Sequence, residues 1–589
     1  MLSACGKCKN NFEIKNKDLF FYDNISPFFN GVKYPIPIPK LCPDCRLQRR
    51  LVFRNDRNYY KRACTLCSKN IVSLYSEDKN FPVYCKDCFW NEAYDPRKYG
   101  MEYDFEKTLW EQLAKLRIQT PRIAIYNTQS ENSDYTVHSS RNKNAYMSCS
   151  SLEAQDIFYT DWGIRCRDSS DLYICYDMEL CYFCSFSGKC FHSMFLEHCT
   201  QVNESVFCSD CRNCNDCIGC VGLRGKNYYL FNTQVTREEY ENYKKEIFEN
   251  YEKFLGAESK YKALKKSLPK NALWSKNSQN CTGNYLDDSK DCSQCYNVKG
   301  VETGSYNYEL TESKNAYDVA RAGRAENVYE IEGAVELSYS LFCNLCYQSD
   351  NMIYCDNCMN SHYCFGCFGL KNSSYCILNK QYSKEEYEIL VPKIIESMGE
   401  AFSVDRLSNL EEVNTNNDDK RSVLRSTTEH GQTINASAWG EFFPMSLSSY
   451  GYNETKAFDY FILTKNEALH NGLMWKDVLE TENHSNQNIF SEVKHASQVD
   501  ESSVADLLVC NFCQKKFKII LPEFQLYKKL GVWFPDACYS CRHKKIMEGQ
   551  LPYHLTSTHC KRCNEVIETS YDVNSEVVYC EKCYLESVY

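Results

Sequence analysis

Residues 168–221 read, in rows of nine, DSSDLYICY, DMELCYFCS, FSGKCFHSM, FLEHCTQVN, ESVFCSDCR and NCNDCIGCV. The fifth column of these rows holds one leucine and five cysteines, and the eighth column holds cysteine, serine or valine. The same frame continues through nine rows from Asp288. Columns restricted to small or apolar residues at a fixed period indicate a repeat whose equivalent positions all face one narrow core.

This period predicts a mainly β fold. Nine residues suit one short strand and one turn, so two rows can form one coil of a parallel β-solenoid similar to a β-roll. The rows lack the Gly-Gly-x-Gly-x-Asp pattern of calcium-binding nonapeptides, which argues against calcium. Cys217-Ile-Gly-Cys recurs as Cys364-Phe-Gly-Cys, so we expect two solenoid halves. Each half ends at a capping-box pattern that predicts a covering helix; the two patterns are Thr236 with Glu239 and Ser383 with Glu386.

The two ends of the chain carry the same arrangement of cysteines. Each end has four Cys-x-x-Cys pairs, and the second and third pairs are separated by 18 residues in both copies, 46–63 and 542–559. Two such pairs supply the four thiolates of a tetrahedral structural zinc site. We expect four zinc ions with neighbouring pairs sharing an ion, and crossed pairing is the alternative. The expected ligands are Cys5, Cys8, Cys42, Cys45, Cys64, Cys67, Cys85, Cys88, Cys510, Cys513, Cys538, Cys541, Cys560, Cys563, Cys580 and Cys583.

These terminal segments resemble the probable-zinc-ribbon modules of uncharacterised bacterial proteins. The signature of that family is a Cys-x-x-Cys pair, an aromatic-rich loop and Cys-Pro-x-Cys-Arg, which appears here as Cys42-Pro-Asp-Cys-Arg. The second copy departs from it with Tyr539 in place of the proline. The resemblance covers roughly residues 1–100 and 505–589, and it implies a zinc-ribbon fold and no activity.

The inward columns of the repeat are also rich in cysteine. The simplest interpretation is a small hydrophobic residue stacked in a narrow core. The alternative is one further metal ion in each half, which would raise the zinc content from four to six. The candidate ligands for these additional ions are Cys208, Cys211, Cys217, Cys220, Cys355, Cys358, Cys364 and Cys367.

The composition is that of a mildly acidic chain of 589 residues, with 68 lysines and arginines against 78 acidic residues. This balance excludes a basic coat over the whole surface, so any basic binding surface must be local. No signal-peptide core is present, and no stretch approaches the roughly 18 apolar residues of a spanning helix. We expect a cytoplasmic protein whose 38 cysteines are metal ligands or buried thiols rather than disulfides.

These observations predict nine segments along the chain. Residues 409–436 and 480–503 are polar and aperiodic, as linkers are, and nine aromatic residues crowd the segment between them, which we expect to pack on a neighbouring part of the protein. The predicted segments are a double zinc ribbon (1–100, with a following helix to about 120), a first solenoid half (127–235), a helical cap (236–276), a second solenoid half (277–382), a helical cap (383–408), a linker (409–436), the aromatic-rich segment (437–479), a linker (480–503) and a second double ribbon (505–589).

The link between the first two ribbons is the strongest indication of function. It interleaves basic and aromatic residues, and guanidinium groups bind phosphates while aromatic rings stack on bases, so nucleic acid, RNA or a ribonucleoprotein in particular, is the expected partner. A second explanation is that these arginines pair with acidic groups on the solenoid and orient the ribbons. The candidate nucleic-acid-binding residues are Arg46, Arg49, Arg50, Arg54, Arg57, Tyr59, Tyr60, Lys61 and Arg62.

Two other functional classes are considered. A long solenoid with variable outer columns suits a protein-binding scaffold, which needs no basic patch. A metal-dependent or redox enzyme is the third hypothesis, and it is the weakest because the sequence shows neither a phosphate-cradling glycine loop nor a nucleophile motif. We therefore expect non-enzymatic binding without a membrane partner, and the sequence identifies no small-molecule substrate.

Overall fold

The computed structural model describes residues 1–314, 317–319, 321–323, 326–333, 341–344, 347–399, 439–477, 489–490, 495–501 and 507–588. The chain forms two compact units: unit 1 comprises Met1–Ala124 with Trp274–Val478, and unit 2 comprises Ile125–Leu273 with Leu479–Tyr589. The N-terminal cysteine module therefore shares a unit with the second repeat half, and the C-terminal module shares one with the first half. The predicted linker 409–436, and most of the linker 480–503, lie outside the described residues.

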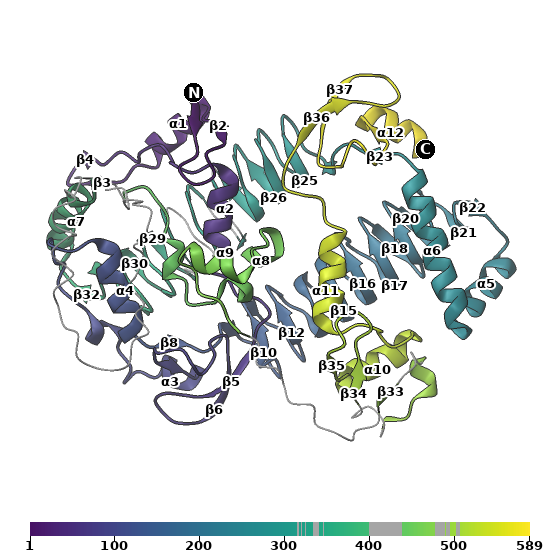
Figure 1. Ribbon diagram of the computed structural model, residues 1–589, viewed down its shortest axis with the longest axis horizontal. Coiled ribbons are helices and arrows are strands. Elements are labelled where there is room, and N and C mark those ends of the chain that lie inside the picture. The colour runs from purple at the N-terminus through teal and green to yellow at the C-terminus, as the bar shows by residue number, and fades with distance from the viewer. Residues whose placement is uncertain are drawn as a thin grey trace. The chain divides into compact units, whose positions relative to one another are not determined.

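The first repeat half, in unit 2, is a ladder of parallel strands. Its strands are joined by hydrogen bonds into one 12-stranded sheet, which Figure 1 shows as successive rungs. The hairpin partner β22 (Thr233–Gln234) pairs antiparallel with the last rung. The parallel strands are β10 (Tyr135–Val137), β12 (Tyr146–Cys149), β13 (Gln155–Phe158), β14 (Asp161–Ile164), β15 (Arg167–Tyr176), β16 (Glu179–Ser185), β17 (Phe191–Glu197), β18 (Thr200–Asn203), β19 (Val206–Ser209), β20 (Arg212–Ile218) and β21 (Asn227–Leu230).

The register of this ladder corrects the nine-residue repeat. Leu172 lies opposite Cys184, and Cys181 lies opposite Ser193, so the chain returns to a neighbouring rung after 12 residues. Two rows of nine would have required 18 residues. The expected coil length is therefore wrong, whereas the expected parallel, strand-rich half is present.

A period of three residues underlies the register of 12. From His138 to Phe231 every third residue has a positive φ, between 43° and 62° at the non-glycine positions. Every member of the buried core cluster of this half, from Ala145 to Cys220, directly follows one of these residues and points inward. Four triplets make the register of 12 between neighbouring strands, and three triplets make the interval of nine visible in the sequence.

The second repeat half, in unit 1, follows the same register. Leu286 lies opposite Val298, and Met352 lies opposite Cys364, again 12 residues apart. Two sheets are described, separated by residues that the structure describes only in part. The first consists of β24 (Ser275–Lys276), β25 (Gly283–Asp287), β26 (Cys295–Glu302), β27 (Tyr308–Lys314) and β28 (Ala322–Gly323); the second consists of β29 (Asp350–Ile353), β30 (His362–Phe365), β31 (Cys376–Ile377) and β32 (Lys380–Gln381).

Helices follow both halves, as the capping boxes predict. Thr236 and Glu239 cap α5 (Arg237–Glu249), which leads into α6 (Tyr251–Ser267). Tyr240 and Ile247 of α5 are buried against the last rungs of the first ladder. The N–H of Ser383 donates to Glu386 ahead of α7 (Lys384–Gly399), whose buried face includes Tyr387. None of the helices in the described ranges is both long and apolar enough to cross a lipid bilayer.

Each terminal module contains two short hairpins that carry a cysteine pair and two helices that start at a cysteine pair, and the N-terminal module has a further hairpin, β3 with β4. The N-terminal module contains β1 (Leu2–Ala4), β2 (Asn11–Glu13), α1 (Asn16–Asn24), β3 (Phe28–Phe29), β4 (Val32–Lys33), α2 (Pro43–Leu51), β5 (Tyr60–Ala63), β6 (Asn70–Ser73), β7 (Val83–Tyr84) and α3 (Lys86–Trp90), followed by α4 (Leu109–Gln119) and β8 (Arg122–Ile123). The C-terminal module contains β34 (Leu507–Val509), β35 (Lys516–Phe517), α10 (Leu521–Leu530), α11 (Tyr539–Glu548), β36 (Thr556–His559), β37 (Val566–Thr569), β38 (Val578–Tyr579) and α12 (Glu581–Val588).

The aromatic-rich segment between the predicted linkers packs within unit 1, as expected. Phe442 and Phe443 are buried, and both rings contact Phe53, which follows α2. The indole of Trp439 donates to the carbonyl oxygen of Pro35. This segment also forms the short helices α8 (Ala457–Tyr460) and α9 (Lys465–His470). Its buried aromatic rings form part of the core next to the N-terminal module.

Candidate metal centres and the arginines that dock them

The sixteen terminal cysteines form four groups of four. Within each group all four sulfur atoms lie within 4.8 Å of one another, which is the arrangement needed to hold one metal ion. Neighbouring pairs combine, as expected, and the crossed alternative is wrong. Site 1 contains Cys5, Cys8, Cys42 and Cys45; site 2 contains Cys64, Cys67, Cys85 and Cys88; site 3 contains Cys510, Cys513, Cys538 and Cys541; site 4 contains Cys560, Cys563, Cys580 and Cys583.

All four sites have the same local architecture. The first pair lies on the turn of a hairpin, and the residue after its second cysteine has a positive φ: Lys9, Ser68, Gln514 and Asn564. The second pair lies where a helix begins; for example, Cys42 caps α2 and Cys538 caps α11. Each site thus combines one hairpin turn with the first turn of a helix, where the helix dipole favours negative charge on the sulfur atoms.

The sulfur–sulfur distances match a tetrahedral zinc site. Cys8 Sγ lies 3.7 Å from Cys42 Sγ, and the corresponding distances in the other sites are 3.8, 3.6 and 3.7 Å. A tetrahedron with zinc–sulfur bonds of about 2.3 Å has edges of about 3.8 Å. A disulfide would require about 2.05 Å. The spacing therefore fits zinc bound by four thiolates.

Backbone N–H groups donate hydrogen bonds to the sulfur atoms and stabilise their thiolate form. The N–H of Cys85 donates to Cys64 Sγ over 3.2 Å, and the N–H of Cys580 donates to Cys560 Sγ over the same distance. Burial alone would raise the pKa of Cys64, but hydrogen bonds from the backbone N–H groups of Cys67, Cys85 and Leu66 outweigh it and lower the pKa to about 6. The pKa values of Cys510 and Cys560 fall to about 6 for the same reason. The first cysteine of these sites is thus a thiolate, the metal-binding form, near neutral pH.

The arginines of the predicted nucleic-acid surface are buried and ion-paired. Arg46 and Arg50 both bond the carboxylate of Asp318, at 2.7 and 3.5 Å. Arg49 lies between Glu330, at 2.5 Å, and Glu441, at 2.6 Å. Two of these three carboxylates, Asp318 and Glu330, belong to the second repeat half, so the alternative explanation, in which the arginines bind acidic groups of the repeat, describes this structure. The exposed fractions of Arg46, Arg49, Arg50 and Arg54 are 2%, 7%, 0% and 2%.

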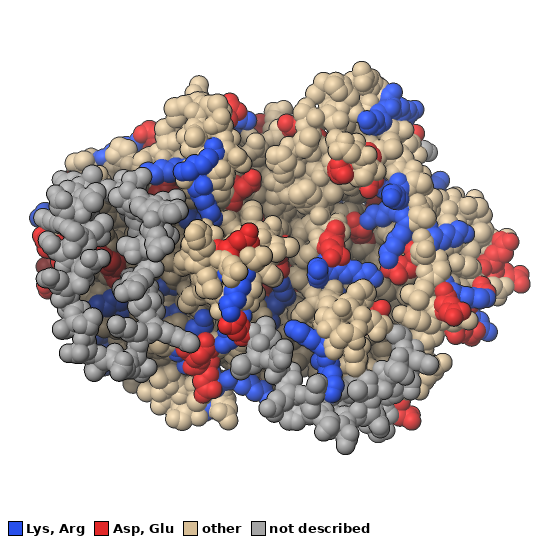
Figure 2. Space-filling view, in the orientation of Figure 1, with Lys and Arg blue, Asp and Glu red and all other residues tan. Residues whose placement is uncertain are grey.

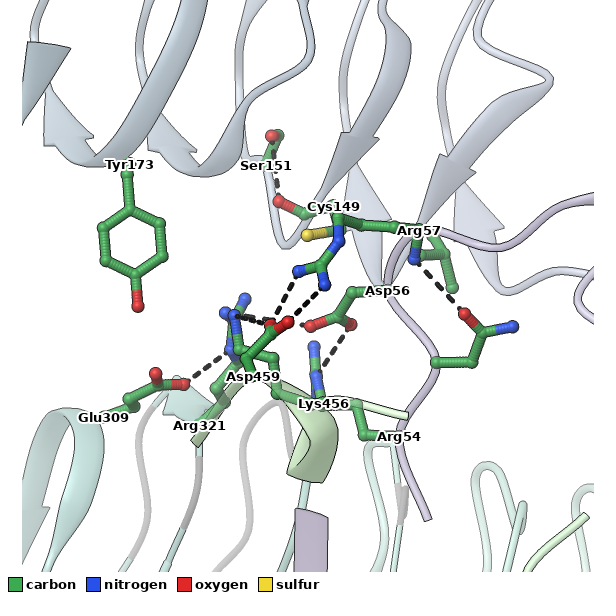
Figure 3. A network of polar contacts seen from close by, with 12 residues as sticks. Arg54, Asp56, Arg57, Cys149, Ser151, Tyr173, Glu309, Arg321, Lys456 and Asp459 are labelled. Carbon is green, nitrogen blue, oxygen red and sulfur yellow. Dashed lines mark hydrogen bonds and ion pairs between the residues drawn. The ribbon is translucent and has the colours of Figure 1, made fainter. Parts of the chain in front are cut away.

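The network continues beyond α2 (Figure 3). Arg54 bonds Asp56 at 2.9 Å, and Arg321 of the second half bonds Glu309 at 2.8 Å. Arg57 donates through both terminal nitrogens to Asp459 of α8. Charges of both signs therefore alternate through this part of unit 1, and the arginines hold the module, the second half and the aromatic-rich segment together.

The remaining residues of the link are less deeply buried. The hydroxyl of Tyr60 donates to Glu454, and the guanidinium of Arg62 donates to the carbonyl oxygen of Ser76. Tyr59 is half-buried, and Lys61 is exposed. Lys61 is thus the member of the predicted surface that solvent reaches most freely.

Unit 2 repeats the docking contact of unit 1. Arg542 of α11 bonds Asp171 of the first half at 2.9 Å, as Arg46 bonds Asp318. Each guanidinium also lies over a tyrosine ring, at 4.7 Å for Tyr159 and 5.6 Å for Tyr306. The interval of 147 positions between Cys217 and Cys364 also separates Asp171 from Asp318 and Tyr159 from Tyr306. The two modules therefore dock on equivalent points of the two halves.

A carboxyl of the module completes each docking contact. Tyr159 donates to Glu523, the third residue of α10, and Tyr306 donates to Asp18, the third residue of α1. Burial raises the pKa of Glu523 to about 7. Sequence reasoning missed these groups, although the recurrence of Asp171 and Asp318 within the 147-residue duplication was an available signal.

The cysteines inside the ladders make a different kind of contact. Cys175 Sγ donates to the carbonyl oxygen of Cys184 over 3.4 Å, and Cys208 Sγ donates to that of Cys217 over 3.6 Å, nine residues further along the chain. Burial raises the pKa of Cys208 well above its usual range. Among the described residues, the eight cysteines considered for additional ions do not form a compact group of the kind seen in sites 1–4. Metal binding by these eight residues stays a prediction.

No family model matches this chain, and no curated protein is significantly similar to it.

Proposed function

We propose that this chain is a non-enzymatic binding scaffold, in which four zinc ions hold two double modules and each module docks on one β-solenoid half. Four tetrahedrally spaced thiolate groups support zinc as the metal. The register of 12, with an inward side chain in every triplet, supports a solenoid. The probable-zinc-ribbon resemblance is consistent with structural rather than catalytic metal, because four protein ligands leave no open position.

The observation that carries the proposal is the repeated docking contact. In both units a metal site fixes the start of a helix, that helix carries a buried arginine, and the arginine meets an aspartate of a ladder. Buried charges are costly unless they are paired, so this contact specifies one arrangement of module and ladder. The metal acts on the scaffold by holding the arginine helix in place.

Metal analysis of the purified full-length chain tests the proposal. We expect about four zinc ions per chain. Cys563→Ser should reduce the content to about three, whereas Cys217→Ser, which removes a buried ladder thiol, should leave it at four. Chelation should open both docking contacts and expose α2 and α11 to protease. A chain that purifies without zinc and keeps both helices protected in strong chelator would refute the proposal, and a content of about six would place ions inside the ladders.

Nucleic acid is the candidate partner for this scaffold. The link that first suggested it has five arginines whose guanidinium groups already bind carboxylates, so changing them to alanine would disturb the fold as well as any binding. Lys61→Glu is the better test of the link because this side chain is exposed. Nucleic-acid binding that falls with this change alone would favour the link.

A further inference from the structure

The hairpin of site 3 carries an exposed aromatic ring between two metal ligands. Phe512 lies between Cys510 and Cys513, and 65% of its surface is exposed. No ring contact of Phe512 is found among the described residues. The corresponding residue of site 2, Leu66, is also exposed but is aliphatic. A flat apolar ring fixed at the tip of a metal-bound turn is a rigid stacking surface.

Three lysines follow this ring on the same hairpin. Lys515, Lys516 and Lys518 follow the turn, and all three side chains are exposed. Phe517 between them packs against the core of the module, whereas Lys516 and Lys518 are exposed. Within the described residues, neither Lys515 nor Lys518 has a carboxylate partner.

The local charge is strongly positive. Residues 507–530 contain five lysines, of which Lys529 pairs with Asp168 at 3.0 Å, and one acidic residue, Glu523, which is 1% exposed and bonds tyrosine hydroxyls. Asp536, whose backbone oxygen accepts a hydrogen bond from Asn511, adds one negative charge beside the turn, which leaves the lysines in excess. Over α5 and α6, by contrast, acidic and basic side chains are interspersed (Figure 2), and pairs such as Lys245 with Glu249 neutralise each other.

We infer that the site 3 hairpin binds single-stranded nucleic acid, with a base stacked on Phe512 and phosphates bound by Lys515 and Lys518. A single exposed ring flanked by separated ammonium groups suits an alternation of bases and phosphates. Double-stranded nucleic acid keeps its bases inside the stack, so it could use only the lysines. This inference rests on the proposed scaffold, since the metal ion holds the turn that presents the ring.

Fluorescence anisotropy of labelled 12-nucleotide oligouridine and oligothymidine with the zinc-loaded full chain tests the inference. Phe512→Ala should weaken binding about fivefold to a hundredfold, the effect of losing one stacked base. Lys515→Ala with Lys518→Ala should reduce the slope of log affinity against log salt by about 1.4, from two lost phosphate contacts. The two oligonucleotides distinguish RNA from DNA as the preferred ligand, and a duplex of the same length should bind more weakly.

The equivalent hairpin of site 2 supplies matched controls. Leu66→Ala and Lys69→Ala change the positions that correspond to Phe512 and Lys515, and both should leave the affinity unchanged. Every variant should retain four zinc ions, which separates loss of the surface from loss of the fold. The inference fails if the oligonucleotides do not bind at 50 mM salt, if the site 3 variants bind like the native chain, or if only anionic phospholipid vesicles bind. In each of these cases a content of four zinc ions with intact docking would leave the proposed scaffold standing.

Discussion

The contact between Arg542 and Asp171 gives the most direct test of how a module is held on its ladder. Arg542 is 4% exposed, and its guanidinium donates to Asp171 over 2.9 Å and lies 3.6 Å from Glu523. Because burial raises the pKa of Glu523 to about 7, this second carboxyl is a weak counter-ion at neutral pH. Asp171→Asn therefore leaves a buried guanidinium with little compensating negative charge.

The expected effect follows from the cost of an unpaired buried charge. Removing one partner of a buried ion pair costs about 3–5 kcal/mol. The substitution raises the free energy of the docked state only, because water solvates Arg542 once the module separates from the ladder. At about 1.4 kcal/mol for each factor of ten, the undocked population should rise by roughly a hundredfold to a few thousandfold.

Hydrogen exchange of the zinc-loaded full chain, followed by mass spectrometry, measures this opening at the amides of α11. Asp177→Asn is the matched control, because Asp177 also has a positive φ on the same ladder but pairs with Arg165 in an exposed ion pair. Its effect should stay below about 1 kcal/mol. Combining Asp171→Asn with Arg542→Met should restore much of the protection. Equal exchange in the Asp171 and Asp177 variants would refute the docking argument.

Two further changes test the pH response and the ladder geometry. Because the pKa of Glu523 is raised, the folded state holds a proton that the unfolded state lacks between about pH 4.5 and 7. The native chain should therefore lose stability as the pH rises through this range. Glu523→Gln should flatten this pH dependence of the free energy of unfolding, measured by urea unfolding at fixed zinc concentration. Gly283 has a φ of 130°, and a Cβ there would lie 1.8 Å from the carbonyl oxygen of Cys295, so Gly283→Ala should lower the melting temperature. Gly225→Ala, with a φ of 62° and open space around the new Cβ, should lower it less.

The metal sites were predictable because their chemistry is local. Two cysteines with two residues between them can share an ion through one turn, so spacing alone identifies the ligands. The pairing of neighbours followed from loop length, and the four observed groups confirm it. The sequence did not reveal that the second pair begins a helix, although Pro43 after Cys42 is typical of a first helical turn.

The repeat was recognised, but its length was misjudged. Inward residues recur every third position, so a period of nine and a period of 12 both align inward positions with inward positions. The neglected signal is the second column of the nine-residue rows, which holds Ser169, Met178, Ser187, Leu196, Ser205 and Cys214 and is also buried. The buried serines have a structural role: Ser169 Oγ accepts from the N–H of Cys181, 12 residues later. Contacts between neighbouring rungs distinguish 12 from nine, and they require the folded chain.

The interpretation of the basic link shows what sequence alone does not decide. Arginine beside tyrosine suits nucleic acid, yet the same groups suit a buried interface with acidic partners. The partners Asp318 and Glu330 lie more than 250 positions away from these arginines, in the second repeat half. Their pairing with α2 depends on which module packs with which half, and the order of the segments along the chain suggests the opposite pairing.

The two metal sites of each module position different elements: one positions the helix that docks on a ladder, and the other positions a strand that pairs with the segment leaving the unit. Sites 1 and 3 position the arginine helices that dock on a ladder. Sites 2 and 4 position β7 and β38, which pair with β8 and with β23 (Lys270–Asn271). The N–H of Ala124 donates to Tyr84, and the N–H of Ala272 donates to Tyr579, both over 2.9 Å, just before the chain leaves each unit. Loss of metal from sites 1 and 3 should therefore release docking, whereas loss from sites 2 and 4 should free the segments that connect one unit to the other.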